Sequence, residues 1–155
     1  MRKLAAIVTT ALMITAMGTA AQAASTSVDG TESYEKLVVN NGNNNLVFKL
    51  HAPGGKCAIK YLQVKFRDRD GTAYEMNGGC YPGAVWAASL VRGDKLIDCN
   101  NFTLKYNATS SVWTGTIPRT CLNRLGGAIK VTYSYVDDYS PMPGEVTGTK
   151  YVAKG

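Results

Sequence analysis

The sequence predicts an all-β fold: a sandwich of two antiparallel sheets, jelly-roll-like or Ig-like, with about nine short strands. Three observations support this prediction. Apolar and polar residues alternate over short runs, as they do along a strand that is buried on one face. Turn-forming residues recur about every ten residues, and there is no long amphipathic helical pattern. The chain also has four cysteines, an even number that suits two disulfide bonds.

Residues 1–23 have the pattern of a secretory signal peptide. Arg2 and Lys3 give a positive start, an apolar stretch follows from Leu4 to Met17, and Ala21-Gln22-Ala23 matches the small-x-small cleavage pattern. A membrane anchor is the alternative, but the apolar stretch is short and is interrupted by threonines. We therefore expect cleavage after Ala23, a secreted protein without a membrane span, and a mature chain of 132 residues.

The mature chain is long enough for one domain with its own core. We expect a flexible N-terminal lead over residues 24–33 and a single β-sandwich domain over residues 34–155. Removing the signal peptide lowers the formal net charge from +6 to +4, because Arg2 and Lys3 are lost. This mildly basic charge is compatible with anionic cell-wall polymers, but many secreted proteins share it. We expect no nucleic-acid partner, and the composition does not indicate an oligomeric state.

The sequence of the first half of the domain predicts two hairpins and a further strand. An Asn-rich turn separates the first two strands, and Asp70-Gly71 is a hairpin signal between the next two. One further apolar run is compatible with a strand or a helical turn, and we favour the strand. The predicted strands are Tyr34–Asn40, Leu46–Leu50, Cys57–Arg69, Thr72–Met76 and Ala84–Val91.

The second half is organised around a hairpin between Cys99 and Cys121. Two alternating runs flank the polar loop 107–111, and Pro118 ends the second run because it cannot donate to a strand ladder. A disulfide between the two cysteines would close the open end of this hairpin. The predicted strands of this half are Phe102–Tyr106, Val112–Ile117, Ala128–Val136 and Val146–Val152.

The four cysteines are expected to pair as Cys57–Cys80 and Cys99–Cys121, because each pair brackets a strand–turn–strand unit. Other pairings stay open. A zinc site is the alternative, but Cys-x2-Cys spacings are absent and His51 is the only histidine. We expect no metal and no cofactor.

Catalytic residues are not indicated. His51 stands at a predicted strand end, and no nucleophile motif accompanies it, so a surface position is the simpler interpretation. Asp68 and Asp70 could serve a glycosidase or a calcium ion, but Asp70-Gly71 already has an explanation as a turn. Asp137 and Asp138 are a second possible calcium corner. We therefore expect that the protein is not an enzyme, and whether either aspartate pair binds calcium stays open.

Binding residues are better indicated. The predicted strand Cys57–Arg69 has one apolar face and one cationic face that begins with a tyrosine. Tyrosines in predicted loops are candidates for exposure, whereas Trp113 and Tyr133 fit a core. A solvated sheet face is the plain alternative for the cationic strip. The candidate ligand-binding residues are Tyr61, Lys65, Arg67, Arg69, Tyr81 and Tyr139.

Arg119 supports an alternative function. It follows Pro118 and stands two residues before Cys121, so a disulfide-tethered segment would present it. Such an arginine could occupy the specificity pocket of a trypsin-like protease. Arg119 could instead cap the end of the hairpin.

The segment Ile117–Leu122 reads IPRTCL and is followed by a glycine-containing turn and the strand-like IKVTYSY. Together these resemble the C-terminal half of small secreted actinobacterial proteins. The resemblance covers Asp98–Tyr135 and implies a jelly-roll sandwich akin to carbohydrate-binding or DOMON-type domains. It transfers no functional residue. The expected function is a secreted, non-enzymatic binding module for a glycan or an anionic cell-envelope polymer, with a protease inhibitor as the alternative.

Overall fold

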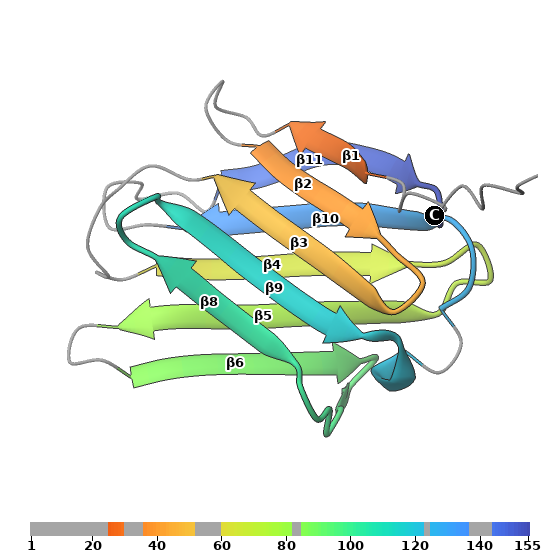
Figure 1. Cartoon of the computed structure of the whole chain (residues 1–155), viewed down its shortest axis with the longest axis horizontal. Coiled ribbons are helices and arrows are strands. Elements are labelled where there is room, and N and C mark those ends of the chain that lie inside the picture. The colour runs from red at the N-terminus through yellow and green to blue at the C-terminus, as the bar shows by residue number, and fades with distance from the viewer. Residues whose placement is uncertain (1–24, 30–35, 52–59, 82–84, 123–124, 137–143) are drawn as a thin grey trace, which may run out of the picture.

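The computed structural model describes residues 25–29, 36–51, 60–81, 85–122, 125–136 and 144–155. Over these residues the protein is a β-sandwich of two antiparallel sheets, which lie one in front of the other in Figure 1. This confirms the all-β class and the sandwich architecture. The predicted signal peptide lies outside the described residues.

The first sheet has five strands in the order β1-β2-β3-β9-β8. Its inner positions are set by the alternation along each strand, and the register places Leu50 opposite both Leu37 and Trp113. All three side chains are buried. The strands are β1 (Ser25–Asp29), β2 (Lys36–Asn41), β3 (Asn45–His51), β8 (Thr103–Asn107) and β9 (Val112–Pro118).

The second sheet has six strands in the order β11-β10-β4-β5-β6-β7. Within the described residues, sheet neighbours follow one another in the chain except at β3–β9 and β10–β4. The two sheets cross obliquely, and β1 contacts β11 at one side of the sandwich (Figure 1). The strands are β4 (Lys60–Arg67), β5 (Ala73–Tyr81), β6 (Val85–Arg92), β7 (Lys95–Leu96), β10 (Ile129–Val136) and β11 (Gly144–Val152).

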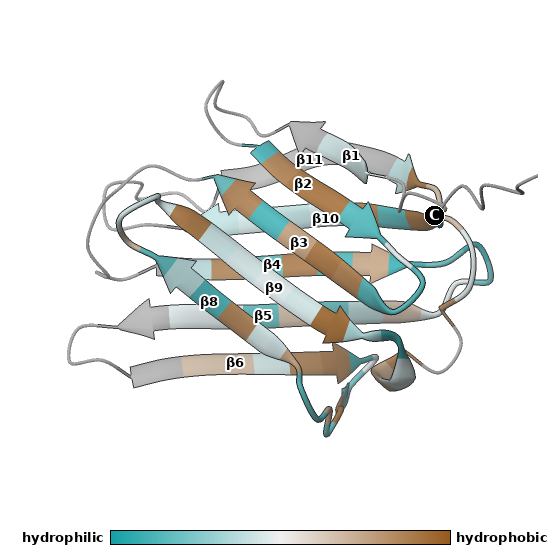
Figure 2. Cartoon of the chain, viewed as in Figure 1, coloured by the Kyte–Doolittle hydropathy of each residue, from teal (hydrophilic) through white to brown (hydrophobic). Residues whose placement is uncertain are grey.

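The core lies between the sheets, where the apolar positions of both meet. Burial alternates along β2 and β3, and Figure 2 shows apolar residues along much of both strands. Two glycines allow the close fit: Leu104 of the first sheet occupies the space above Gly78, and Met76 of the second occupies the space above Gly115. A Cβ at either glycine would collide with its neighbour, so these positions favour glycine by close approach.

Aromatic side chains fill much of this core. The ring of Phe66 packs against the rings of Phe48 and Tyr74. The distance between ring centroids is 5.3 Å to Phe48 and 5.5 Å to Tyr74. Trp113 contacts Tyr135 edge-on from the opposite sheet. Trp113 and Tyr133 are both buried, as predicted. Burial of large rings supplies much of the apolar area that stabilises a domain of this size.

The strand predictions need two corrections. Ser25–Asp29 was expected in a flexible lead, but it forms β1 and pairs with β2. An edge strand needs a partner only on one side, so a polar segment without a clear apolar pattern can still pair. The return strand expected to end at Met76 continues to Tyr81. Asn77-Gly78-Gly79 lies within this strand because Gly78 receives Leu104 rather than forming a turn.

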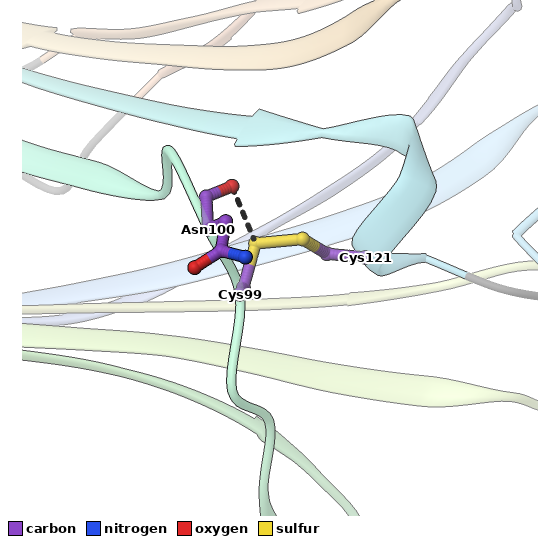
Figure 3. The surroundings of a disulfide bond; sticks show 3 residues. All are labelled: Cys99, Asn100 and Cys121. Atoms are coloured by element: carbon purple, nitrogen blue, oxygen red, sulfur yellow. Dashed lines mark hydrogen bonds between the residues drawn. A yellow bond between two sulfur atoms is a disulfide. The ribbon is translucent and has the colours of Figure 1, made fainter.

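The disulfide Cys99–Cys121 is confirmed. It joins the segment before β8 to η1 (Arg119–Cys121), the 3₁₀ turn after β9, and so closes the open end of the β8–β9 hairpin (Figure 3). The two Cα atoms are 5.5 Å apart. The other expected bridge, Cys57–Cys80, involves Cys57, which lies outside the described residues.

Candidate ligand-binding face

The predicted cationic strip lies on the outer face of β4. Leu62, Val64 and Phe66 point into the core, so the residues between them point away from the first sheet. Tyr61 is half-buried, and Lys65 and Arg67 are exposed. Strand β4 therefore positions these three residues on one surface, as the alternation predicted.

Arg69 is exposed but lies beyond the end of β4, in the turn to β5. Asp68 holds this turn: its Oδ1 accepts a hydrogen bond from the backbone N–H of Thr72 at 3.0 Å. Its backbone carbonyl accepts one from Gly71, whose φ of 87° suits glycine. The turn interpretation of Asp70-Gly71 is confirmed, and Arg69 belongs to the turn rather than to the sheet face.

Neighbouring strands add residues to the outer face that the strip alone did not include. Lys130 of β10 stands opposite Arg67, and Glu75 of β5 stands opposite Lys65. The alternation of β10 predicts an outward Lys130, but not which strand it pairs with. That register is a contact between segments more than sixty residues apart in the chain.

The two opposed pairs, Lys130 with Arg67 and Glu75 with Lys65, line a pocket of about 370 Å³. We call it the cationic pocket and define it by Lys65, Arg67, Lys130 and Glu75. Its remaining lining comes from Phe66, Ala73, Tyr74, Gly93 and Thr132.

The charges of the cationic pocket are not balanced. Among the described residues that line it, three cations face one acid. Lys65 Nζ lies 3.9 Å from Glu75 Oε2. Within the described part of the chain, Arg67 and Lys130 form no ion pair. Like charges directly opposite each other on a sheet are destabilising, so the pair Arg67 and Lys130 has an electrostatic cost.

Glu75 is held in place by two amide groups. Its Oε1 accepts hydrogen bonds from Asn77 Nδ2 at 2.7 Å and from Gln63 Nε2 at 3.0 Å. The Tyr61 hydroxyl donates to Asn77 Oδ1 at 2.9 Å, and the Ser134 hydroxyl donates to Gln63 Oε1 at 3.4 Å. The outer face is thus an ordered polar surface in which Glu75 also orients Lys65.

Arg119 has a different environment. Its Nε donates to the carbonyl of Gly42 at 2.9 Å, its Nη1 to the carbonyl of Leu125 at 3.0 Å, and its Nη2 to Asn41 Oδ1. Partial burial lowers the pKa of the guanidinium from its ordinary value. A protease would have to draw this side chain out of its hydrogen bonds, which weakens the inhibitor alternative.

Asn41 is the partner that completes this arrangement. It is fully buried, and its Nδ2 donates to the carbonyls of Gly127 and Val152, both at 3.0 Å. The backbone carbonyl of Asn41 accepts a hydrogen bond from the backbone N–H of Gly155 at 3.1 Å. We call Arg119, Asn41 and the carbonyls that they bind the Arg119 hub. Sequence reasoning missed Asn41, because it was assigned to a turn.

The other predicted residues contribute little. His51 is exposed at the end of β3, opposite Lys36 and Val112. The backbone of Tyr81 ends β5, but its side chain is not described, and Tyr139, Asp137 and Asp138 lie outside the described residues. Among the residues that the structure describes, no three His, Cys, Asp or Glu side chains form a group that could hold a metal ion.

No helix in the described part of the chain is long and apolar enough to cross a membrane. No protein-family model matches the chain, and comparisons with curated proteins and with solved structures gave no significant match.

Proposed function

We propose that the protein is a secreted, non-enzymatic binding module that holds a glycan or an anionic polymer of the cell envelope. The binding surface is the outer face of the second sheet. The observation that carries the proposal is the cationic pocket, where three cations face one acid and where Arg67 and Lys130 stand opposite each other. An anion in the pocket would relieve their repulsion.

Charge alone would not single out this surface, because the first sheet also has exposed lysines on its outer face. On the second sheet, the cations surround a hollow. A concave site brings several charged groups to one ligand group and screens them less than a flat surface does. We expect binding that weakens as salt concentration rises, since the cations remain accessible to solvent.

Several expectations accompany this proposal. The signal peptide would export the chain to a compartment in which Cys57–Cys80 forms alongside the observed disulfide. A jelly-roll arrangement and a relation to small secreted actinobacterial proteins would agree with a carbohydrate-binding role. These expectations depend on the sequence pattern and on the resemblance over Asp98–Tyr135.

The test is retention of the secreted protein on cell-wall material. The variant Lys65→Glu with Arg67→Glu reverses two charges at the cationic pocket. The matched control is Lys49→Glu with Lys105→Glu, two exposed lysines on the outer face of the first sheet. Both variants change the net charge equally, so a general charge effect would affect them alike.

We expect the pocket variant to lose about tenfold or more in affinity and the control to lose less than about twofold, since tenfold corresponds to about 1.4 kcal/mol. Equal losses would show that the net charge, and not this face, governs retention. Unchanged retention of the pocket variant would remove the cationic pocket from the proposal.

A further inference from the structure

A second hollow lies on the same outer face, next to the cationic pocket. Its volume is about 250 Å³. Glycine, alanine and serine residues line much of it, together with Tyr61 and Asn77. The lining residues are Tyr61, Asn77, Gly78, Gly79, Ala87, Ala88 and Ser89.

The two hollows lie along the same strands. In β4, Tyr61 lines the second hollow and Lys65 lines the cationic pocket, so the two are four residues apart, or about 13 Å at the usual strand rise. In β5, Gly79 and Glu75 mark the corresponding positions, because Gly79 pairs with Tyr61 and Glu75 pairs with Lys65. This separation exceeds the width of a single sugar ring. A ligand that fills both hollows must therefore be an oligomer.

The two hollows differ in charge. None of the described residues that line the second hollow has a charged side chain, whereas three of those that line the cationic pocket are cations. Glu75 lines the cationic pocket and accepts a hydrogen bond from Asn77, which lines the second hollow, so its charge would repel an anionic group placed beside Asn77. The hydroxyl and amide groups of Ser89 and Asn77, beside the phenol of Tyr61, suit an uncharged sugar ring.

We infer that the ligand is an acidic oligosaccharide in which charged and uncharged rings alternate. Its carboxylate or phosphate group lies in the cationic pocket, and an uncharged neighbouring ring lies in the second hollow. This inference rests on the proposed function and extends it, because it names the class of glycan and assigns the ring-binding residues. A polymer with a charge on every ring fits less well, because Glu75 faces its second charge.

The experiment measures affinity by titration calorimetry with the secreted form of the protein. Hyaluronan oligosaccharides alternate charged and uncharged rings, oligogalacturonides carry a carboxylate on every ring, and poly(glycerol phosphate) is anionic without rings. We expect the hyaluronan octasaccharide to bind about tenfold more tightly than either of the other two, a difference of about 1.4 kcal/mol.

The variant Ala87→Trp fills the second hollow. Ala87 is exposed, so the larger side chain does not disturb the core. The matched control is Ala108→Trp, at an exposed alanine in the loop between β8 and β9. Ala87→Trp should lower the affinity for the octasaccharide about tenfold and leave poly(glycerol phosphate) binding within about twofold. Ala108→Trp should change neither. Thermal melting checks that both variants fold.

Two results would overturn the inference. One is that Ala87→Trp leaves the octasaccharide affinity unchanged. The other is that hyaluronan binds no more tightly than the two comparison polymers. If retention on wall material still depended on Lys65 and Arg67, the proposed function would stand without the second hollow. If retention did not depend on these two residues, both the proposed function and this inference would be overturned.

Discussion

Two arginines near strand ends, Arg67 and Arg119, have opposite environments. Arg119 follows β9 and donates hydrogen bonds from all three guanidinium nitrogens to groups within the domain. Arg67 ends β4, is exposed, and forms no ion pair within the described residues. Arg119 contributes to folding because its donors are satisfied within the domain. Arg67 keeps its donors available, which is what a ligand-binding cation requires.

The difference extends to the surroundings of each arginine. The Arg119 hub connects the end of β2, the segment before β10 and the end of β11 through hydrogen bonds that are buried or part-buried. A buried carbonyl among them would cost free energy if it were left without a donor. In the cationic pocket the side chains face solvent, and removing one leaves nothing buried and unpaired. We therefore expect mutations at the hub to change stability and mutations at the pocket to change binding.

The largest expected effect is at the disulfide beside the hub. Replacing both Cys99 and Cys121 by alanine should lower the free energy of unfolding by about 3 kcal/mol, because the bridge closes a loop of 22 residues' separation. Chemical denaturation measures this loss. The same variant should bind wall material normally while it is folded. A loss below about 1 kcal/mol would mean that the unfolded chain gains little conformational entropy when the disulfide is removed.

The next effect is at Arg119 itself. Arg119→Met keeps much of the side-chain volume but leaves the Gly42 and Leu125 carbonyls and Asn41 Oδ1 without this donor. We expect a loss of about 2 kcal/mol in the free energy of unfolding, since water can reach part of the site. The control is Arg69→Met in the exposed turn, which should change stability by less than about 0.5 kcal/mol. Equal effects would contradict the structural role of the hub.

This contrast also shows where sequence reasoning succeeded and where it could not. The alternation in β4, β9 and β10 is a local pattern. It predicted all three strands and, in β4, the outward position of Lys65 and Arg67. The partners of Arg119 come from Gly42 and Leu125, and the first is 77 residues away in the chain. No local pattern marks such a contact.

The same reason accounts for the missed residues. Lys130 joins the cationic pocket through the β10–β4 register, which depends on how two distant segments pair. Asn41 was assigned to a turn by its composition, although it is a buried residue at the end of β2. Residue types predicted which side chains are capable of binding or capping. The three-dimensional pairing decided which of them do so.

A smaller effect tests whether the pocket cations are retained for binding. Lys130→Gln removes the repulsion with Arg67 across β4 and β10, so it should raise the free energy of unfolding by about 0.3 kcal/mol. The affinity for an anionic polymer should fall by about threefold, because one of three cations is lost. Denaturation and retention assays on the same preparation measure both changes. A variant that loses stability without losing affinity would indicate a structural role for Lys130.

The smallest expected effect, and the sharpest separation of the two roles, is at Glu75. In Glu75→Gln the side-chain carbonyl can still accept the hydrogen bonds of Asn77 and Gln63, which reach Oε1 in the native protein. The ion pair with Lys65 is lost, but it spans 3.9 Å between partly exposed groups, so its loss should cost less than about 0.5 kcal/mol. The pocket then has three cations and no acid among its lining residues.

We expect the affinity of this variant for an anionic polymer to rise by about twofold to threefold and to fall more steeply with salt, because the net positive charge of the pocket is larger. The increase should vanish in the background of Lys65→Glu with Arg67→Glu. If affinity fell instead, Glu75 would act mainly by orienting Lys65 and the two amides. Its contribution would then resemble that of Asn41 in the Arg119 hub, and the separation between a folding region and a binding region would not hold at this residue.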